Sequence, residues 1–479
     1  MREGTRGGQL QLVSPKQIKK IHEAALHILE EKGIMVEEPQ TRGLLSKGGC
    51  LVDEESHVVK FPRKVVKDSL SEAPSSFTMN GRDEENDFVL DYEKSYFTAG
   101  TGTTSVLDFE TDERRKATKA DLADAVKLGD QLDNIDVVWS IFTLTDNPTL
   151  GFHQLYAVLA NSTKHGAIVN WYGGELTDKL IDMIAAVAGG RENLSEKKLV
   201  TMYAEPVSPL SFRKENLEVL LRWTEVGLPL LWYPAQKAGA TAPMTLAGML
   251  SQAFAESLGG NVIAQLNNPG TPVILGASPL MMDMRTALNT YFSPETLIVQ
   301  SATGQWGDLI EMPIYGTGGC TNSYAIDYQA GVESGLTLYG AILGGQNLIH
   351  DLDFAGAGDL GALNLLTLTD EIAGMAKRTA RSLSTDEDAI ALDVIENVKH
   401  GGDYLREKHT FKHFREELMT PELIRRIGDD KWERNYSVER AREKTRELLE
   451  DADVPPLPKD VEKEIEGIID EASSLINKS

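Results

Sequence analysis

Apolar and polar residues first alternate at helical spacing, in a segment that begins at Ser14-Pro15 and stops at Gly33. The apolar positions of this segment are Ile18, Ile21, Ala25, Ile28 and Leu29. A serine followed by a proline is typical of a helix N-cap and first turn, so the pattern predicts an amphipathic helix. In residues 50–92 the pattern is short, mixed and rich in turn residues, which predicts a small α+β appendage.

Beyond this appendage, short apolar runs alternate with helical stretches eight times. The runs are residues 96–99, 136–142, 167–172, 199–205, 229–233, 272–277, 312–315 and 347–351. Their starts are roughly 30 to 43 residues apart, the length of the strand-helix unit that parallel strands require. Three of the helices are expected to end at the pairs Gly189-Gly190, Gly259-Gly260 and Gly344-Gly345. The pattern predicts an α/β fold, a closed (β/α)8 TIM barrel in preference to an open doubly wound sheet.

Three parts of the chain follow from this pattern. Residues 1–94 are predicted to form an N-terminal helical and α+β appendage, residues 95–377 the (β/α)8 catalytic barrel, and residues 378–479 a C-terminal helical extension. Past Lys377 opposite charges recur at helical spacing until the prolines of residues 454–458 interrupt them. A segment of this kind is typical of C-terminal packing or oligomerisation, and we expect a homo-oligomer.

Composition and charge exclude some classes of binding partner. The chain has 479 residues, 41% of them hydrophobic, and can bury a large core. Its formal net charge of −25 repels nucleic acid and anionic membrane surfaces. No apolar run approaches the length that crosses a bilayer, and the start lacks a secretory signal, so we expect a cytoplasmic protein. Two cysteines, Cys50 and Cys320, cannot supply a disulfide framework or a cysteine zinc site.

Aromatic and polar side chains gather at the carboxyl ends of the predicted strands, where the chemistry of a (β/α)8 barrel takes place. The candidate substrate-binding residues are Tyr96, Asn170, Tyr172, Tyr203, Glu205, Trp232, Tyr233, Tyr315 and His350. Such rings could form a cage that binds a quaternary ammonium group by cation–π attraction. Because neighbouring residues of a strand point to opposite faces, the alternative is that about half of them face the helix layer.

The sequence His350-Asp351-Leu-Asp353 at the eighth strand raises the question of a metal. No second histidine or cysteine stands at another predicted strand end, so we expect no metal there. His350 is better interpreted as a hydrogen-bond donor to a carboxylate, with a structural histidine as the alternative. Glu205 could hold a cation or pair with a basic residue of a neighbouring strand.

Two glycine-rich segments follow the seventh and eighth strands. The first, GTGGCTN, lacks the Gly-Lys-Ser/Thr of a P-loop, and the second, GAGDLG, has aspartates around it that would repel a phosphate. We therefore expect both to shape the mouth of a substrate site. The candidate mouth residues are Gly316, Gly318, Gly319, Asn322, Gly356 and Gly358. Alanine at Gly318 and Gly319 is expected to impair activity more than folding.

Several segments resemble the trimethylamine methyltransferase superfamily over nearly the whole chain. They are VNWYGG, EPVSPL, GATAPMTLAG, GTGGCTNSYAIDYQAG and GGQNLIHDLD. The resemblance implies a (β/α)8 barrel that passes a methyl group from a methylamine to the cobalt of a separate corrinoid protein. It also implies that cobalamin is carried by that partner and that no cofactor is held tightly by this chain.

The founding trimethylamine enzymes of that family carry pyrrolysine in or close to the segment that matches residues 316–331, where this chain has the ordinary residues Tyr324-Ala-Ile-Asp327. The chain looks like the non-pyrrolysine branch, whose members demethylate quaternary amines such as glycine betaine. A quaternary amine leaves as a neutral amine without a proton, so it needs positioning in place of a reactive side chain. The alternatives are another N-methyl substrate such as carnitine or proline betaine, a non-catalytic betaine-binding subunit, and a metal-dependent barrel hydrolase.

Overall fold

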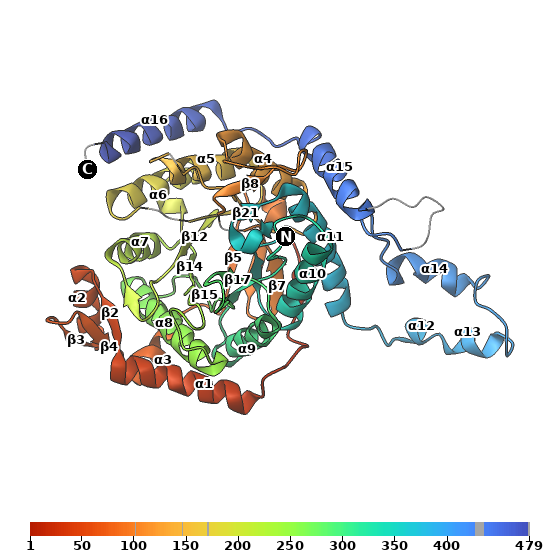
Figure 1. Cartoon of the computed structure of the whole chain (residues 1–479), viewed down its shortest axis with the longest axis horizontal. Coiled ribbons are helices and arrows are strands. Elements are labelled where there is room, and N and C mark those ends of the chain that lie inside the picture. The colour runs from red at the N-terminus through yellow and green to blue at the C-terminus, as the bar shows by residue number, and fades with distance from the viewer. Residues whose placement is uncertain (101, 146, 170–171, 427–434, 478–479) are drawn as a thin grey trace.

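The computed structural model describes residues 1–479 except 101, 146, 170–171, 427–434 and 478–479. Eight parallel strands form its centre (Figure 1). They are β7 (Lys94–Phe97), β10 (Val137–Trp139), β11 (His165–Val169), β12 (Val200–Ala204), β14 (Leu230–Trp232), β15 (Val273–Gly276), β18 (Ile314–Thr317) and β19 (Leu348–His350). Strands β7 and β19 pair in parallel, and a parallel bridge between Thr98 and Val137 joins β7 to β10. The sheet is therefore a closed barrel, as the sequence predicted.

Helices on the outside cover each strand of the barrel. They are α4 (Lys119–Gln131), α5 (Leu150–Asn161), α6 (Glu175–Ala188), α7 (Lys214–Glu225), α8 (Leu246–Asn267), α9 (Pro294–Ile310), α10 (Tyr328–Leu343) and α11 (Leu363–Ala380). The strands are buried on both faces, which explains why they read as continuous apolar runs and not as alternating ones. The fold is thus the predicted (β/α)8 barrel, with each of the eight predicted runs overlapping one strand.

Of the three predicted Gly-Gly helix ends, two are confirmed and one is wrong. Helix α6 stops before Gly189, which adopts a left-handed conformation, and α10 stops before Gly344. Gly259-Gly260 instead lies inside α8. A Cβ at Gly260 would stand 2.2 Å from the indole Nε1 of Trp232. Gly260 lets α8 lie close against β14, and Gly259 lies against Ile34 and Phe212, so both glycines serve packing and not helix termination.

The N-terminal segment builds onto the barrel from outside. Helix α1 (Pro15–His27) starts with the predicted Ser14 cap and continues as a π-helical turn η1 (Ile28–Lys32) to Gly33. The other elements of this segment are β1 (Thr5–Arg6), β2 (Ile34–Val36), α2 (Pro39–Lys47), β3 (Leu51–Asp53), β4 (Val58–Lys60), α3 (Arg63–Glu72), β5 (Ser76–Met79), the 3-10 turn η2 (Glu84–Asn86) and β6 (Phe88–Asp91). Helices α1 and α3 pack against α8, while β2 pairs with β13 (Ser211–Phe212).

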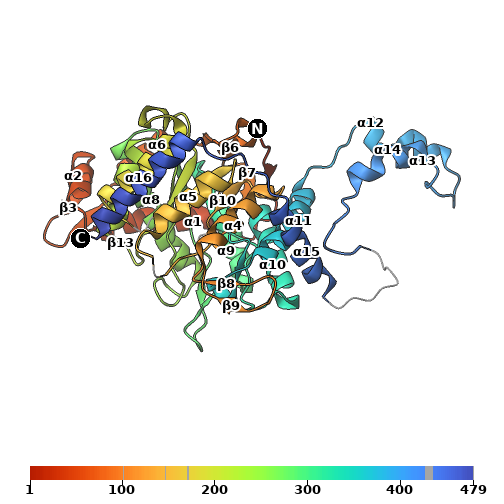
Figure 2. The same ribbon diagram turned by 90° about the horizontal axis from the view of Figure 1, so that it is seen from above.

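Past α11 the chain leaves the barrel and returns. Helices α12 (Glu387–Ile390), α13 (Leu392–Asn397) and α14 (Lys408–Glu417) project away from the body in both views (Figures 1 and 2), and we call residues 381–426 the arm. None of these three helices buries a residue. Helix α15 (Tyr436–Glu450) then packs on α11, and α16 (Lys459–Ile476) packs on α6. Among the described residues, no helix combines the length and apolarity that a bilayer span requires.

Short strands cover the carboxyl end of the barrel. Strands β8 (Ser105–Leu107) and β9 (Arg114–Arg115) form one small sheet with β20 (Phe354–Ala355) and β21 (Leu360–Gly361). A hairpin of β16 (Met281–Met282) and β17 (Asn289–Thr290) forms part of the loop that follows β15. The turn η4 (Gly356–Gly358) connects β20 to β21, and η3 (Arg191–Asn193) follows α6. The barrel mouth is therefore built of the loops that follow the strands.

Candidate active site

Five rings meet at the carboxyl end of the barrel, each from a different strand. Tyr203, Tyr233 and Tyr315 have ring centroids 5.1 to 6.1 Å apart. The imidazole of His350 stacks on Tyr315 at 3.9 Å, and Trp139 meets Tyr203 edge-on at 6.3 Å. All five side chains are buried. Strand-end residues that are far apart in the sequence thus form one cluster.

Hydrogen bonds fix the orientation of His350 within the cluster. Its Nδ1 lies 2.7 Å from Oδ1 of Asp351, and its Nε2 lies 3.1 Å from the hydroxyl of Thr317. The phenol of Tyr233 is 3.2 Å from the same hydroxyl. Both ring nitrogens are therefore engaged by the chain itself. The carboxylate that His350 contacts belongs to the protein. In this structure His350 therefore has no free ring nitrogen for its predicted role as a donor to a substrate carboxylate.

Four polar atoms of the cluster are buried without a hydrogen-bond partner among the described residues. They are Oδ2 of Asp351, Oδ2 of Asp353, the phenol oxygen of Tyr315 and the indole Nε1 of Trp139. A buried polar group without a partner costs about 1 to 3 kcal/mol, and more when the group is charged. Asp351 also has a backbone φ of 76°, a left-handed conformation that is uncommon outside glycine. Both features are typical of a site shaped for a ligand.

The charge of Asp351 affects the pKa values of surrounding groups. Burial first, and then the negative charge of Asp351, raises the pKa of Tyr291 and Tyr315 well above the ordinary value, so these phenols stay neutral. Burial, helped by the charge of Asp351, also raises the pKa of Asp353 to about 7. The centre therefore combines neutral rings with carboxylates, which attract a cation and repel an anion.

A cavity of about 300 Å³ opens beside the cluster, within the usual size range of small-molecule pockets. It is lined by residues of β11, β12 and α7, among them Tyr172, Tyr203, Glu205 and Asn216. Glu205 accepts a hydrogen bond of 2.9 Å from the phenol of Tyr203. Glu205 is an exposed residue, but burial of its carboxyl group among surrounding protein atoms raises its pKa by desolvation. The cavity thus places an acidic group beside Tyr203, the one ring of the cluster that lines it.

The structure does not bring all the predicted substrate-binding residues together. The ring of Tyr96 packs at a tilt against Phe88, and its phenol donates to the carbonyl of Val89, away from the cluster. Trp232 faces the helix layer, where its indole donates to the carbonyl of Glu256. Both predictions fail because strand residues alternate between faces. Tyr172 lines the cavity, and Asn170 lies outside the described residues.

The glycine-rich segments are tightly packed and not pliable. A Cβ at Gly316, Gly318 or Gly319 would meet Gln346, Ile349 or Leu352 within 3 Å. Asn322 bridges to the hairpin, since its amide donates to Phe292 and its oxygen accepts from Tyr291. Gly356 and Gly358 pack against Tyr324 and Tyr291. The packing argues against the expectation that alanine at positions 318 and 319 impairs activity more than folding, because a Cβ there would strike neighbouring atoms.

Sequence reasoning considered Asp351 and Asp353 only in the question of a metal, and it also missed Trp139, Tyr291 and Glu256. Trp139 ends β10, and its place at a strand end was the signal that could have identified it. Tyr291 follows the β16–β17 hairpin, a loop without any pattern that marks it. Glu256, buried in α8, accepts hydrogen bonds from Ser208 and the backbone of Leu210, and so holds the loop that carries Glu205.

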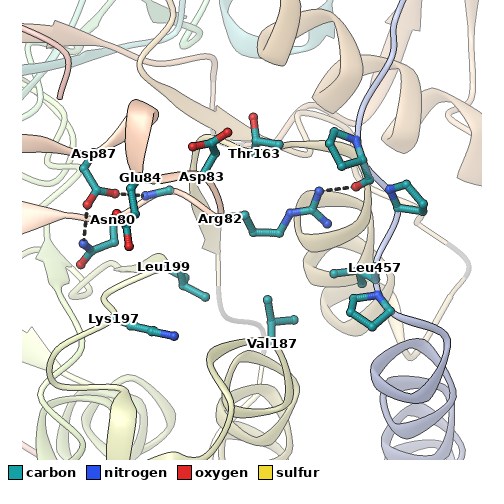
Figure 3. Close-up of a pocket in the computed structure, with 14 residues that line it drawn as sticks. Asn80, Arg82, Asp83, Glu84, Asp87, Thr163, Val187, Lys197, Leu199 and Leu457 are labelled. Atoms are coloured by element: carbon teal, nitrogen blue, oxygen red, sulfur yellow. Dashed lines mark hydrogen bonds between the residues drawn. The ribbon is translucent and has the colours of Figure 1, made fainter.

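A second and larger cavity, of about 610 Å³, lies at the opposite, amino-terminal end of the barrel (Figure 3). Arg82 donates to the carbonyl oxygen of Pro455 at 2.5 Å. It also donates to the carbonyl oxygen of Leu159 at 3.0 Å. Asp87 accepts from the side chain of Asn80 and the backbone of Gly81. Because the active sites of such barrels lie at the carboxyl end, we assign this cavity no catalytic role.

Comparison with known proteins gives consistent results over the whole chain. A family model described as "Trimethylamine methyltransferase (MTTB)" matches residues 4–474. The chain is 30% identical over 463 residues to the trimethylamine methyltransferase MttB of Desulfitobacterium hafniense strain DSM 10664 / DCB-2, covering 96% of this chain and 93% of that protein. It is 31% identical over 464 residues to the glycine betaine methyltransferase of Desulfitobacterium hafniense strain Y51, covering 96% of each. The crystal structure of the Methanosarcina barkeri monomethylamine methyltransferase MtmB is 12% identical, covering 94% of this chain and 96% of that one, with a TM-score of 0.49.

Proposed function

The chain belongs to the trimethylamine methyltransferase family, and from this premise we propose that it moves a methyl group from a quaternary amine to the Co(I) of a separate corrinoid protein. The observation that carries the proposal is the unpartnered carboxylate oxygen of Asp351, which adjoins His350 in the ring cluster and whose charge acts on Tyr233, Tyr291 and Tyr315. A negative charge beside neutral π faces suits a cation that cannot donate a hydrogen bond.

The chemistry needs no proton. Co(I) supplies an electron pair to the methyl carbon, the C–N bond breaks, and its electron pair stays on nitrogen as a neutral amine. The residues of the site therefore have to bind and orient the cation, which Asp351 and the rings can do. Their attraction weakens as the positive charge leaves nitrogen, so binding that is too tight would raise the barrier.

Glycine betaine is the substrate that we propose, with dimethylglycine as the product. The buried indole N–H of Trp139 and the phenol of Tyr315 have no partner among the described residues and could donate to the carboxylate of that substrate. A relative named for glycine betaine is 31% identical, and the segment from Tyr324 to Asp327 holds ordinary residues. Carnitine and proline betaine remain the alternatives of the same chemistry.

The loops over the cluster would have to open for the corrinoid to approach. In the closed arrangement Tyr233 and Tyr315 are 2% and 0% exposed. The β16–β17 hairpin and the sheet of β8, β9, β20 and β21 follow the carboxyl ends of barrel strands, and they are the segments that we propose to move. Their movement is therefore part of the proposal.

Incubation of the protein with a reduced corrinoid carrier and a panel of amines tests the proposal. We expect the absorbance of methyl-cobalt to appear with glycine betaine and not with trimethylamine. If methyl-cobalt formed with carnitine or proline betaine alone, that compound would replace glycine betaine as the proposed substrate. Saturable binding of betaine without methyl-cobalt would indicate a non-catalytic subunit and overturn the proposal.

A further inference from the structure

The arm carries two histidines on one face of a helix. His409 and His413 stand four residues apart on α14, and their ring centroids are 4.4 Å apart. Asp388 of α12 lies against them, although more than 20 residues separate it from either histidine in the sequence. One ligand atom from each of the three side chains lies within 4.8 Å of the other two. From these positions we propose that the arm binds a divalent transition metal ion, with Zn²⁺ as the best fit, through Asp388, His409 and His413.

Contacts within the group support a common ligand. The Nε2 of His413 is 3.0 Å from Oδ2 of Asp388, yet it is buried and makes no hydrogen bond of acceptable geometry to any described residue. Because the Nε2 of His413 and the Oδ2 of Asp388 lie close without a hydrogen bond between them, both can point toward a metal ion. Three donors of the nitrogen and oxygen type with an open fourth position match the ligand sets of Zn²⁺. Donors around a tetrahedral zinc lie roughly 3.3 Å apart, so small side-chain rotations would complete the site.

Lys412 is the competitor for this position. Its ammonium lies 2.5 Å from the same Oδ2 of Asp388 that faces His413. In the metal-free protein this ion pair holds Asp388, and a bound cation would displace the ammonium to solvent, where its side chain is already 64% exposed. Metal binding should therefore strengthen when the charge of Lys412 is removed.

A metal here would give the arm a shape that its apolar residues cannot give. Helices α12, α13 and α14 bury no residue, so no hydrophobic core joins them. A metal shared by α12 and α14 would close the loop between them and fix their relative position. The inference concerns the arm alone and does not depend on methyl transfer.

Titration of the untagged full chain with ZnCl₂ after removal of metals tests the site. We expect one Zn²⁺ per chain, weakened about 10- to 100-fold by His409→Ala with His413→Ala, unchanged by His400→Ala on the same arm, and tightened several-fold by Lys412→Gln. Limited proteolysis should show that Zn²⁺ protects residues 381–426 in the wild type and not in the double variant.

Absence of zinc binding would overturn the proposal. So would zinc binding of equal strength in the double variant, since the metal would then lie elsewhere on this acidic chain. The substituted side chains lie on an arm without buried helical residues, so the barrel should keep its thermal transition in every variant, and circular dichroism checks this.

Discussion

At the amino-terminal end of the barrel, Arg82 donates to two carbonyl oxygens and Asp87 accepts from two N–H groups. At the carboxyl end, Asp351, Asp353 and Tyr315 each keep a buried oxygen without a partner among the described residues. The amino-terminal cavity has about twice the volume of the other, 610 against 300 Å³. The larger cavity is thus the one where Arg82 and Asp87 already have partners within the protein.

This difference indicates where binding energy is available. A side chain that already donates to the protein gains little when a ligand arrives, because one hydrogen bond only replaces another. A buried oxygen that has no partner gains the whole interaction. We therefore expect changes at the carboxyl end to alter methyl transfer and changes at the amino-terminal end to alter stability.

The largest effect is expected from Asp351→Asn. Removal of the charge that faces the rings should lower kcat/KM for glycine betaine by about 100-fold, a size typical of a lost electrostatic contact in an active site. Asp87→Asn at the opposite end is the matched control and should keep kcat/KM within about twofold. Rates of methyl-cobalt formation measure both. Equal losses of kcat/KM in the two variants would contradict the expected difference between the two ends of the barrel.

A smaller effect is expected from pH, through Asp353. Its raised pKa of about 7 means that its carboxyl group gains a negative charge between pH 6 and pH 8. This charge, added to that of Asp351, should raise kcat/KM for a quaternary ammonium about fivefold, the size of a partly screened charge interaction. Asp353→Asn should make the pH profile flatter.

The same titration lowers the stability of the fold as pH rises, whereas it raises kcat/KM. The folded state binds the proton of Asp353 more tightly than the unfolded state, so its contribution to stability is lost as pH rises from about 4 to about 7. Urea unfolding at several pH values should show a smaller decline for Asp353→Asn than for the wild type. An unchanged decline would mean that the carboxyl group is ionised throughout.

The smallest effect on methyl transfer is expected from Arg82→Ala. Loss of its hydrogen bonds to Leu159 and Pro455 should lower the free energy of unfolding by about 1 to 3 kcal/mol. The rate per folded molecule should stay the same, because the residue lies at the other end of the barrel. A tenfold loss of rate at full folding would give the amino-terminal cavity a functional role.

The barrel could be predicted from the sequence because its strands are buried on both faces and its crossovers have regular lengths. Continuous apolar runs mark such strands even when no single run is distinctive. The Gly-Gly pair at Gly259 could not be read correctly, since a glycine that ends a helix and one that lets Trp232 approach look alike in sequence. Only the neighbouring element distinguishes them.

The site was predictable to a lesser degree. The strand ends identified Tyr203, Tyr233, Tyr315 and His350, which the structure brings into one cluster. Trp232 faces the helix layer because neighbouring strand residues alternate between faces. Which residues face inward depends on twist and bulges that a strand of three residues does not reveal. Tyr291, whose pKa is raised by burial and by the charge of Asp351, follows a hairpin, and loop geometry leaves no periodic pattern in the sequence.

The backbone of Asp351 restricts how this centre could be redesigned. Its left-handed conformation, with φ of 76°, is one that glycine, asparagine and aspartate adopt far more readily than branched or bulky residues. The position can therefore exchange its charge for a neutral amide at little conformational cost, but it cannot readily accept a longer acid or a lysine. An engineer who wanted the barrel to accept an uncharged methyl donor would find asparagine the natural first choice, and would have to look to other strands for any further change.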